Sequence, residues 1–221
     1  IRPVEEFHIA EHDAAGLADD EFRRLLAARA NAPFDLAAEP LIRLDLFHRP
    51  DDRDVLLLCL HHIIADAWSL SIALEEMFAI YMASRSGGTV ALPAVAHGYA
   101  DYVRWQRDFV SGREGERQFA FWREQLSALP PPLDLPVDRT RAPSQTAKGG
   151  ACNFALGPEL VTALKRIAQA ENATFFTVLL AAYKALLYRL TGQDDLLAGV
   201  PVAVRTRAEF ERTVGYFVNP V

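Results

Sequence analysis

The sequence predicts an α/β protein built from two lobes. An uninterrupted apolar run at residues 55–60 is typical of a buried β-strand, and a helical pattern follows it from Leu70. Residues 128–147 are dense in proline and lack a periodic apolar face, as in a stiff linker. Strand and helix patterns alternate again after this linker. We therefore expect an N-terminal lobe over residues 1–127 and a second lobe over residues 148–221.

Composition agrees with a globular protein and limits its partners. The chain has 221 residues, of which 51% are hydrophobic, so it can bury a sizeable core. A net charge of −6 without a basic block argues against nucleic acid and anionic membranes as partners. No apolar run approaches the length of about 18 residues that a membrane span needs, and no signal peptide is evident. Two well-separated cysteines indicate reduced thiols and a cytoplasmic protein.

The first lobe opens with an extended segment at residues 1–12 and an amphipathic helix at residues 17–30. Apolar and polar residues alternate at residues 41–47, which predicts a half-buried strand, and a turn at residues 50–54 leads to the next strand. We expect that second strand, residues 55–60, to be buried on both faces. The two strands should pair antiparallel because the connection between them is short.

Periodicity and breaker residues predict the remaining elements. Helices are expected from Leu70 to the Ser86-Gly87-Gly88 stop, at residues 99–110 and at residues 114–126. The second lobe is expected to contain a strand at residues 151–156, a helix at 158–171, a helix at 174–190 and a core strand at 196–204. The helix at 174–190 is apolar almost all round, which predicts that it is buried.

Titratable residues directly follow the apolar strand. If the strand continued through His61 and His62, their rings would point to opposite faces, so at most one could act on a substrate. The other would be buried with its ring nitrogens hydrogen-bonded. Asp66 can cap the next helix, orient a ring or pair with a distant arginine, and Ser69 is a second capping candidate. An imidazole can accept a proton from an amine near neutral pH, but a core histidine pair at a strand end is the alternative interpretation.

The run HHIIADAWS at residues 61–69 resembles the HHxxxDG signature of condensation domains of non-ribosomal peptide synthetases, in the chloramphenicol acetyltransferase-like superfamily. Five further stretches resemble segments of that family in the same order. They are YVRWQR at 102–107, FWREQL at 121–126, LPVDRTR at 135–141, FFTVLLAAY at 175–183 and GYFVN at 215–219. The resemblance spans nearly the whole chain and favours catalysis over a core histidine pair.

The resemblance implies a two-lobed, V-shaped acetyltransferase-like fold with a tunnel between the lobes, here incomplete at both ends. It implies an amide-forming acyltransferase that joins a donor acyl or aminoacyl thioester to an acceptor aminoacyl thioester. Both substrates would arrive on the phosphopantetheine of donor and acceptor peptidyl carrier proteins. The domain itself would bind no cofactor and no metal. Adjacent adenylation and carrier domains of a larger synthetase would be its other partners.

The resemblance also assigns roles to individual residues. His62 takes the catalytic position, as general base or as a positioning group, and His61 and Asp66 complete the motif. Arg205 would pair with Asp66 across the lobes, with Arg207 as a weaker choice. Four residues would lie along the substrate tunnel: Ala67, Trp68, Ser69 and Asn219. From the residues alone, Arg205 could end a strand in solvent, Asn219 could end a strand, and Trp68 could simply pack.

Two departures from the family pattern keep other functions open. Ala67 replaces a glycine, which would cost about 1 kcal/mol if the backbone were left-handed there. Pro220 replaces a threonine and so lacks an amide donor. The alternatives are a catalytically silent condensation-like docking module, an ester-forming acyltransferase and an epimerisation domain. The sequence contains no Gly-x-Ser-x-Gly elbow, phosphate loop or zinc-binding spacing.

Overall fold

The computed structural model describes residues 8–38, 40–50, 53–138 and 149–221. Two compact units are present, the first formed by Ile1–Arg117 with Val200–Val221 and the second by Gln118–Gly199. The return of the last residues to the first unit was not expected from the sequence. Parts of three expected features lie outside the described residues: the extended start (1–7), the turn (51–52) and the linker (139–147).

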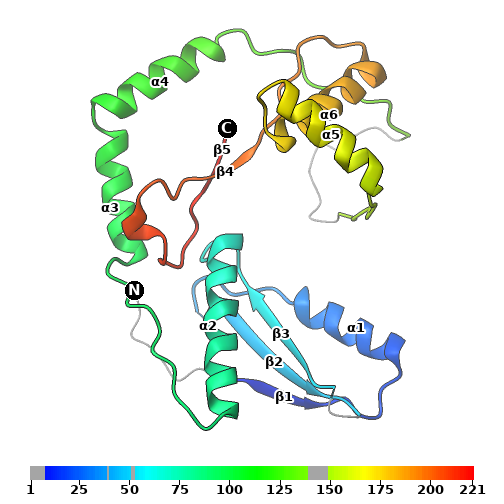
Figure 1. Ribbon diagram of the computed structural model, residues 1–221, viewed down its shortest axis with the longest axis vertical. Coiled ribbons are helices and arrows are strands. Elements are labelled where there is room, and N and C mark those ends of the chain that lie inside the picture. Colours follow the sequence, from blue (N-terminus) through cyan, green and yellow to red (C-terminus); the bar gives the residue numbers. More distant parts are fainter. Residues whose placement is uncertain (1–7, 39, 51–52, 139–148) are drawn as a thin grey trace. The chain divides into compact units, whose positions relative to one another are not determined.

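A three-stranded sheet organises the first unit (Figure 1). Its strands are β1 (Ala10–Asp13), β2 (Ile42–His48) and β3 (Val55–Leu60), in that order across the sheet. The expected antiparallel pairing of the two longer strands is confirmed, with Phe47 opposite Val55 at one end and Ile42 opposite Leu60 at the other. β1 adds to the other edge of β2 in a parallel direction.

Helix α1 (Asp19–Ala30) covers one face of this sheet through an apolar core. Phe22 from the helix meets Phe47 from β2 edge-on, with ring centroids 5.6 Å apart, and Val55 and Leu57 pack around them. The prediction that β3 is buried on both faces is wrong, because Leu56, which points away from α1, is 41% exposed. The helix therefore protects only the face carrying alternate residues of the strand.

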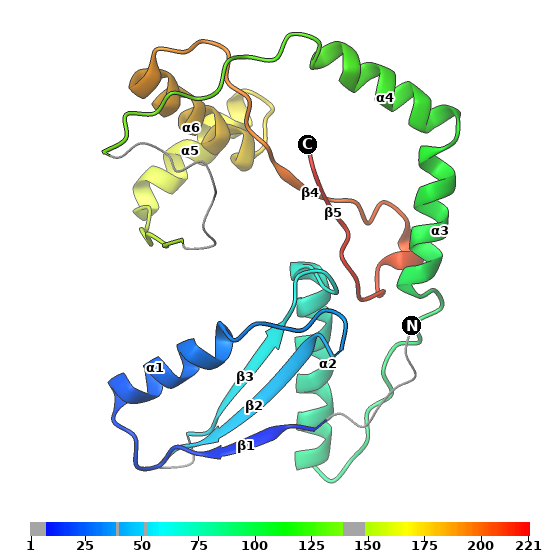
Figure 2. The same cartoon turned by 180° about the vertical axis from the view of Figure 1, so that it is seen from behind.

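Helix α2 (Ala67–Arg85) starts where the loop after β3 ends and runs back along the sheet (Figures 1 and 2). It begins three residues earlier than the sequence predicts, since Asp66 caps it by accepting a hydrogen bond from the Ser69 amide. Helix α3 (Tyr99–Val110) follows as expected. Its Tyr102 is only 2% exposed and packs against rings supplied by the end of the chain.

Those rings belong to the segment after residue 200, which contains β4 (Pro201–Ala203), the 3-10 helix η1 (Ala208–Phe210) and β5 (Val218–Pro220). β4 and β5 pair antiparallel, and Phe210 and Phe217 form a second core with Tyr102. The expected core strand at residues 196–204 is wrong: only three residues are extended in a ladder, and all three are exposed. β5 is their one strand partner among the described residues, so no second layer covers them.

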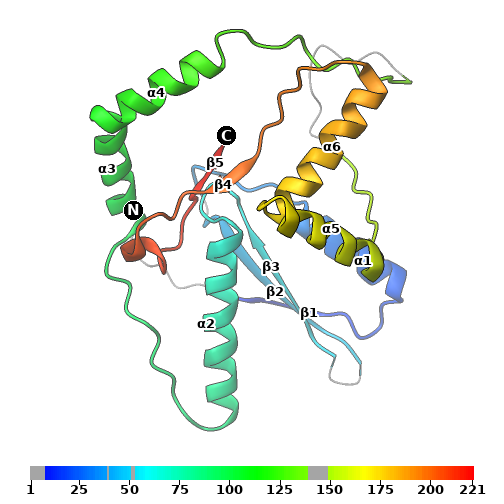
Figure 3. The same cartoon turned by 45° about the horizontal axis from the view of Figure 1, so that its top comes forward.

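Helix α4 (Arg113–Gln125) leads into the second unit, which contains α5 (Pro158–Ala170) and α6 (Phe175–Thr191). These two helices pack against each other (Figure 3). The strand expected at residues 151–156 is absent, because no other described strand pairs with it. The expected burial of α6 is also wrong, since Tyr183 and Leu186 are each 52% exposed. α5 covers just one side of α6.

No single helix in the described part of the chain is long and apolar enough to cross a membrane. The sharply bent pair formed by α5 and α6 passes that test of length and composition when the two are taken together. Both cysteines are free: Cys59 is buried in β3, and Cys152 is exposed.

Candidate active site

The histidine pair lies just beyond the end of β3. The ladder stops at Leu60, and the chain turns so that the Ile64 amide donates to the carbonyl of His61 at 3.1 Å. The two rings therefore do not alternate across a continuing strand, as the sequence had suggested. His61 is half-buried rather than sealed in the core, with its Nδ1 3.1 Å from the Ile63 amide and its ring edge-on to Phe34.

His62 is exposed, and a backbone carbonyl fixes its tautomer. Its Nδ1 lies 2.8 Å from the carbonyl oxygen of Ala65. A carbonyl can only accept a hydrogen bond, so Nδ1 carries the hydrogen and the neutral ring keeps its lone pair on Nε2. An imidazole in this state can accept a proton from a substrate at Nε2.

Asp66 does not contact either histidine ring through any described hydrogen bond. It is 4% exposed and accepts from the Ser69 amide at 2.8 Å and from the Phe217 amide at 3.0 Å. The second contact joins the start of α2 to a segment 151 residues further along the chain. The carboxylate thus connects two distant parts of the first unit.

Arg205 completes this buried group. Its guanidinium donates to Asp66 at 3.1 Å and to the Ser69 hydroxyl at 2.7 Å, and it lies 3.8 Å from the centre of the Phe217 ring. It also donates to the carbonyls of Phe210 and Thr213. The side chains of Arg205 and Asp66 are 4% and 2% exposed. Both residues belong to the first unit, so their ion pair does not cross between lobes as expected.

The charge of Arg205 is compensated by an ionised Asp66. Burial opposes ionisation of Asp66, but hydrogen bonds from Ser69, from the Phe217 amide and from Arg205 outweigh it. Together they hold the pKa of the Asp66 carboxyl below its usual value. The pair is therefore charged at neutral pH and supports the backbone around it.

Ser69 is the meeting point of these contacts. Its hydroxyl donates to the Gly215 carbonyl at 2.8 Å and accepts from the Gly215 amide at 3.0 Å, in addition to the bond from Arg205. The residue is 1% exposed, so it does not line a substrate path as the resemblance implied. All its hydrogen-bonding capacity is used inside the protein. We call Asp66, Ser69, Arg205 and Gly215 the buried hub.

Ala67 and Trp68 lie on the exposed side of the first turn of α2. Ala67 is the first helical residue, and the single non-glycine residue with positive φ among the described ones is Asn172. Alanine therefore causes no left-handed strain at this position. The indole of Trp68 is 49% exposed, and its Nε1 donates to the Glu211 carbonyl at 3.1 Å.

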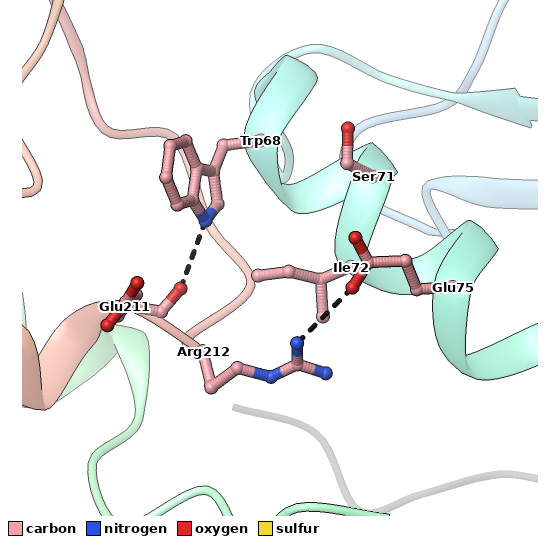
Figure 4. A pocket seen from close by; sticks show the side chains of 6 residues that line it. All are labelled: Trp68, Ser71, Ile72, Glu75, Glu211 and Arg212. Carbon is pink, nitrogen blue, oxygen red and sulfur yellow. Dashed lines mark hydrogen bonds and ion pairs between the residues drawn. The ribbon is translucent and has the colours of Figure 1, made fainter.

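Trp68 also forms one wall of a surface pocket of about 370 Å³ (Figure 4). Arg212 faces it from the other side of the pocket and is tied to Glu75 and Glu76 of α2 by ion pairs of 3.4 and 2.5 Å. Ile72 lies between them. Neither histidine of the pair lines this pocket, so it is separate from the candidate base.

Asn219 lies in β5, where its side chain is exposed and its backbone pairs with Val202. The adjacent Pro220 pairs with Pro201, between pairs that carry the ladder hydrogen bonds. Val200 and Val221 exchange both amide bonds just beyond this pair. The proline ring therefore removes no ladder donor, and this departure from the family pattern causes no loss of pairing.

The sequence analysis missed three residues of the site. Gly215 is required by close approach, since a Cβ built there would lie 2.1 Å from the Tyr99 ring. Tyr99 donates from its hydroxyl to the carbonyl of Tyr216, and the ring of Tyr216 packs against His62. The GYFVN stretch was noticed only for its asparagine, although a glycine beside two aromatic residues is a signal of close packing.

Metal ligation finds no support among the residues that the structure describes. No group of three or more histidine, cysteine, aspartate or glutamate side chains there is arranged to hold an ion.

Comparison with known proteins identifies the family. A model of the condensation domain matches residues 1–221. The chain is 41% identical over 223 residues to part of the linear gramicidin synthase of Brevibacillus parabrevis, covering 99% of this chain and 3% of that relative. It is 43% identical over 198 residues to phosphinothricin tripeptide synthetase PhsB of Streptomyces viridochromogenes, covering 90% of this chain and 17% of that protein. The chain thus spans only a small part of the length of these relatives.

Solved structures agree with the fold predicted from the sequence. The first condensation domain of the CDA synthetase superposes with a TM-score of 0.76 at 27% identity, covering 99% of this chain and 49% of that one. The epimerisation domain from the third module of tyrocidine synthetase B shares the fold, with a TM-score of 0.85 at 23% identity over 99% of this chain and 51% of that one. The chain belongs to the condensation-domain family of non-ribosomal peptide synthetases, whose general role is peptide-bond formation.

Proposed function

We propose that the protein forms an amide bond between two carrier-bound substrates, with His62 as the catalytic residue. The exposed imidazole, whose Nδ1 is tied to the Ala65 carbonyl, is the observation that carries this proposal. The donor is an acyl or aminoacyl thioester, and the acceptor is an aminoacyl thioester with a free amine. Both are delivered on the phosphopantetheine of peptidyl carrier proteins, consistent with the multidomain relatives of this chain.

The proposed reaction needs one proton acceptor. The acceptor amine attacks the donor carbonyl carbon, and Nε2 of His62 takes the proton that the nitrogen releases. The C–S bond then breaks, and the leaving thiolate recovers that proton from the imidazolium. Part of the acceptor amine is already neutral, since an α-amine has a pKa of about 8. Alignment of the two reactants therefore supplies much of the rate, and His62 also contributes contacts to the tetrahedral intermediate.

The other motif residues support this step without touching the reacting atoms. His61 holds the turn through its contact with the Ile63 amide, and the Asp66–Arg205 ion pair orders the neighbouring backbone. Ala67, Trp68 and Asn219 have exposed side chains and are proposed to line the path of the substrates. We assign Ser69 to the buried hub instead, because its hydroxyl is fully used there.

The wider context follows from the same proposal. The donor and acceptor carrier proteins and an adjacent adenylation domain would belong to one larger synthetase. Both cysteines are free thiols, as suits a cytoplasmic enzyme. The lobe division at residues 127 and 148 is retained as a proposal for the complete domain.

Two observations bear on the alternative of a silent docking module. Ala67 occupies an ordinary helical position, and Pro220 occupies a position without a ladder bond. Neither substitution disturbs the backbone, so the two departures give little reason to expect lost activity. Ester formation and epimerisation differ in substrate rather than in this backbone, and the product decides between them.

The test is product formation by the complete parent domain with two loaded carrier proteins. We expect amide product on the acceptor carrier, and His62→Ala should lower the single-turnover rate by about 10²–10⁴-fold. His61→Ala should lower it less, and His8→Ala, at an exposed histidine outside the site, should leave it unchanged. No product from the unmutated domain would favour a docking module. Ester product or an inverted aminoacyl centre would favour the other two alternatives.

A further inference from the structure

The ring of Tyr216 packs against the imidazole of His62. The two ring centroids are 5.3 Å apart and the planes are nearly perpendicular, at 82°. This is a favourable geometry for a pair of aromatic rings. Tyr216 is 38% exposed, so its ring lies at the surface beside the histidine rather than in the core.

The backbone on both sides of Tyr216 is fixed. Before it, the amide and carbonyl of Gly215 both bond to the Ser69 hydroxyl, and the Asp66 amide donates to the same carbonyl at 3.1 Å. After it, Phe217 donates from its amide to Asp66, accepts from the Val204 amide at 2.8 Å, and has a ring that is 0% exposed. The residue between these anchors has little freedom to move.

Tyr99 fixes the tyrosine itself. Its hydroxyl donates to the carbonyl of Tyr216 at 2.7 Å, and its ring meets Phe217 with centroids 5.3 Å apart. The same ring leaves no room for a side chain at Gly215. Every backbone group next to the Tyr216 side chain is therefore tied to a buried or half-buried partner.

The imidazole is attached to the same group of residues. His62 bonds through Nδ1 to the Ala65 carbonyl, and Ala65 directly precedes Asp66 of the buried hub. The histidine and the tyrosine thus reach one another from two segments that the hub joins. A single hydrogen bond at Nδ1 still lets the imidazole of an exposed residue rock about its bonds, whereas a second contact on the ring restricts that motion.

We propose that Tyr216 is a positioning residue that holds the His62 imidazole so that Nε2 points at the acceptor amine. This inference rests on the proposed catalytic role of His62. The tyrosine acts through the packing of its ring and not through its hydroxyl. Loss of the ring would let the imidazole occupy several rotamers, of which one is productive, and would reduce the rate without weakening substrate binding.

The test compares three variants of the complete parent domain. Tyr216→Leu should lower kcat about tenfold while KM changes by less than about twofold, and Tyr216→Phe should restore the rate. Arg212→Gln is the matched control. It loosens the same segment at its ion pairs with Glu75 and Glu76, away from the histidine. That control should keep the kcat of the unmutated domain.

An NMR readout separates this inference from the proposed function. The Cε1–H signal of His62 should be sharp in the unmutated domain and in Tyr216→Phe, and broadened by exchange in Tyr216→Leu. A sharp signal and an unchanged kcat in Tyr216→Leu would overturn the positioning role while His62 remained catalytic. If His62→Ala kept full activity, the proposed function would fail, and the NMR signal alone would then decide whether Tyr216 holds the ring.

Discussion

Two buried aspartates of the first unit each meet an arginine, but they connect different things. Asp45 of β2 is 1% exposed and lies 2.8 Å from His12 and 2.5 Å from Arg29, side chains of the neighbouring β1 and α1. One of its oxygens has no partner among the described residues. Asp66 instead accepts from two backbone amides and from Arg205, which lies 139 residues along the chain.

Exposure of the arginine separates the two pairs further. The side chain of Arg29 is 38% exposed, whereas that of Arg205 is 4% exposed. If its aspartate were neutralised, Arg29 could regain water, but Arg205 would stay buried without compensation. We conclude that the Asp45 pair fastens a helix to a sheet, and that the Asp66 pair orders the backbone next to the proposed catalytic histidine.

The largest effect is expected from Asp66→Asn. The change keeps the size of the side chain but leaves the Arg205 charge unpaired, which should lower the free energy of unfolding by about 3–5 kcal/mol. Urea denaturation of the parent domain measures this difference. A loss below about 1 kcal/mol would mean that the pair behaves like an exposed one, and the contrast with Asp45 would disappear.

Removal of the hub hydroxyl should have an intermediate effect. Ser69→Ala leaves the amide and carbonyl of Gly215 without this partner and should cost about 1–3 kcal/mol in the same denaturation experiment. Ser71→Ala is the matched control, because that exposed hydroxyl only bonds back to Ala67 within α2. The control should stay within about 0.5 kcal/mol of the unmutated domain. Equal losses in both variants would argue against a hub.

Asp45→Asn should cost about 1 kcal/mol, because Arg29 and His12 can turn to solvent when the charge is lost. Condensation activity should not change, since no described contact links Asp45 to the histidine pair. Denaturation and a product assay on the same preparation check both statements. A fall in kcat would show that the sheet and the site are coupled.

Acid should weaken both pairs, with the smallest effect near neutral pH. Burial opposes ionisation of Asp45, but hydrogen bonds from Arg29 and His12 prevail and lower its pKa, as the contacts of Asp66 lower that of its carboxyl. The resulting stability is complete above the unfolded-state pKa of about 4 and is lost as pH falls through the lower folded-state values.

Unfolding free energies measured from about pH 5 downward should therefore decrease for the unmutated domain, and decrease less for Asp66→Asn and Asp45→Asn. The variant that loses a carboxylate has one fewer group that takes up a proton on unfolding. Parallel curves for all three proteins would contradict the assignment of lowered pKa values to these two carboxyls.

Local patterns predicted much of this fold. The ends of α1, α3 and α5 follow from apolar periodicity together with polar and proline start signals, which depend on residues close in sequence. The β2–β3 hairpin follows from alternation and a short connection. Features that depend on distant partners were not predictable, such as the return of the last residues to pack their rings against α3.

The same distinction holds at the site. The motif drew attention to His62, Asp66 and Arg205, but it could not show that Ser69 turns inward to meet Gly215, 146 residues away. Exposure of α6 and of β4 was missed for a related reason: an apolar sequence predicts burial, and burial requires a covering element that the pattern does not contain.

The most direct test of the account compares Ser69→Ala with Asp45→Asn in single-turnover amide formation, at a temperature where both variants are fully folded. Both lose stability, but only the first loosens the backbone that presents His62 and Tyr216. The account predicts a rate about 10- to 100-fold lower for Ser69→Ala and an unchanged rate for Asp45→Asn. Equal rates for the two variants would contradict it.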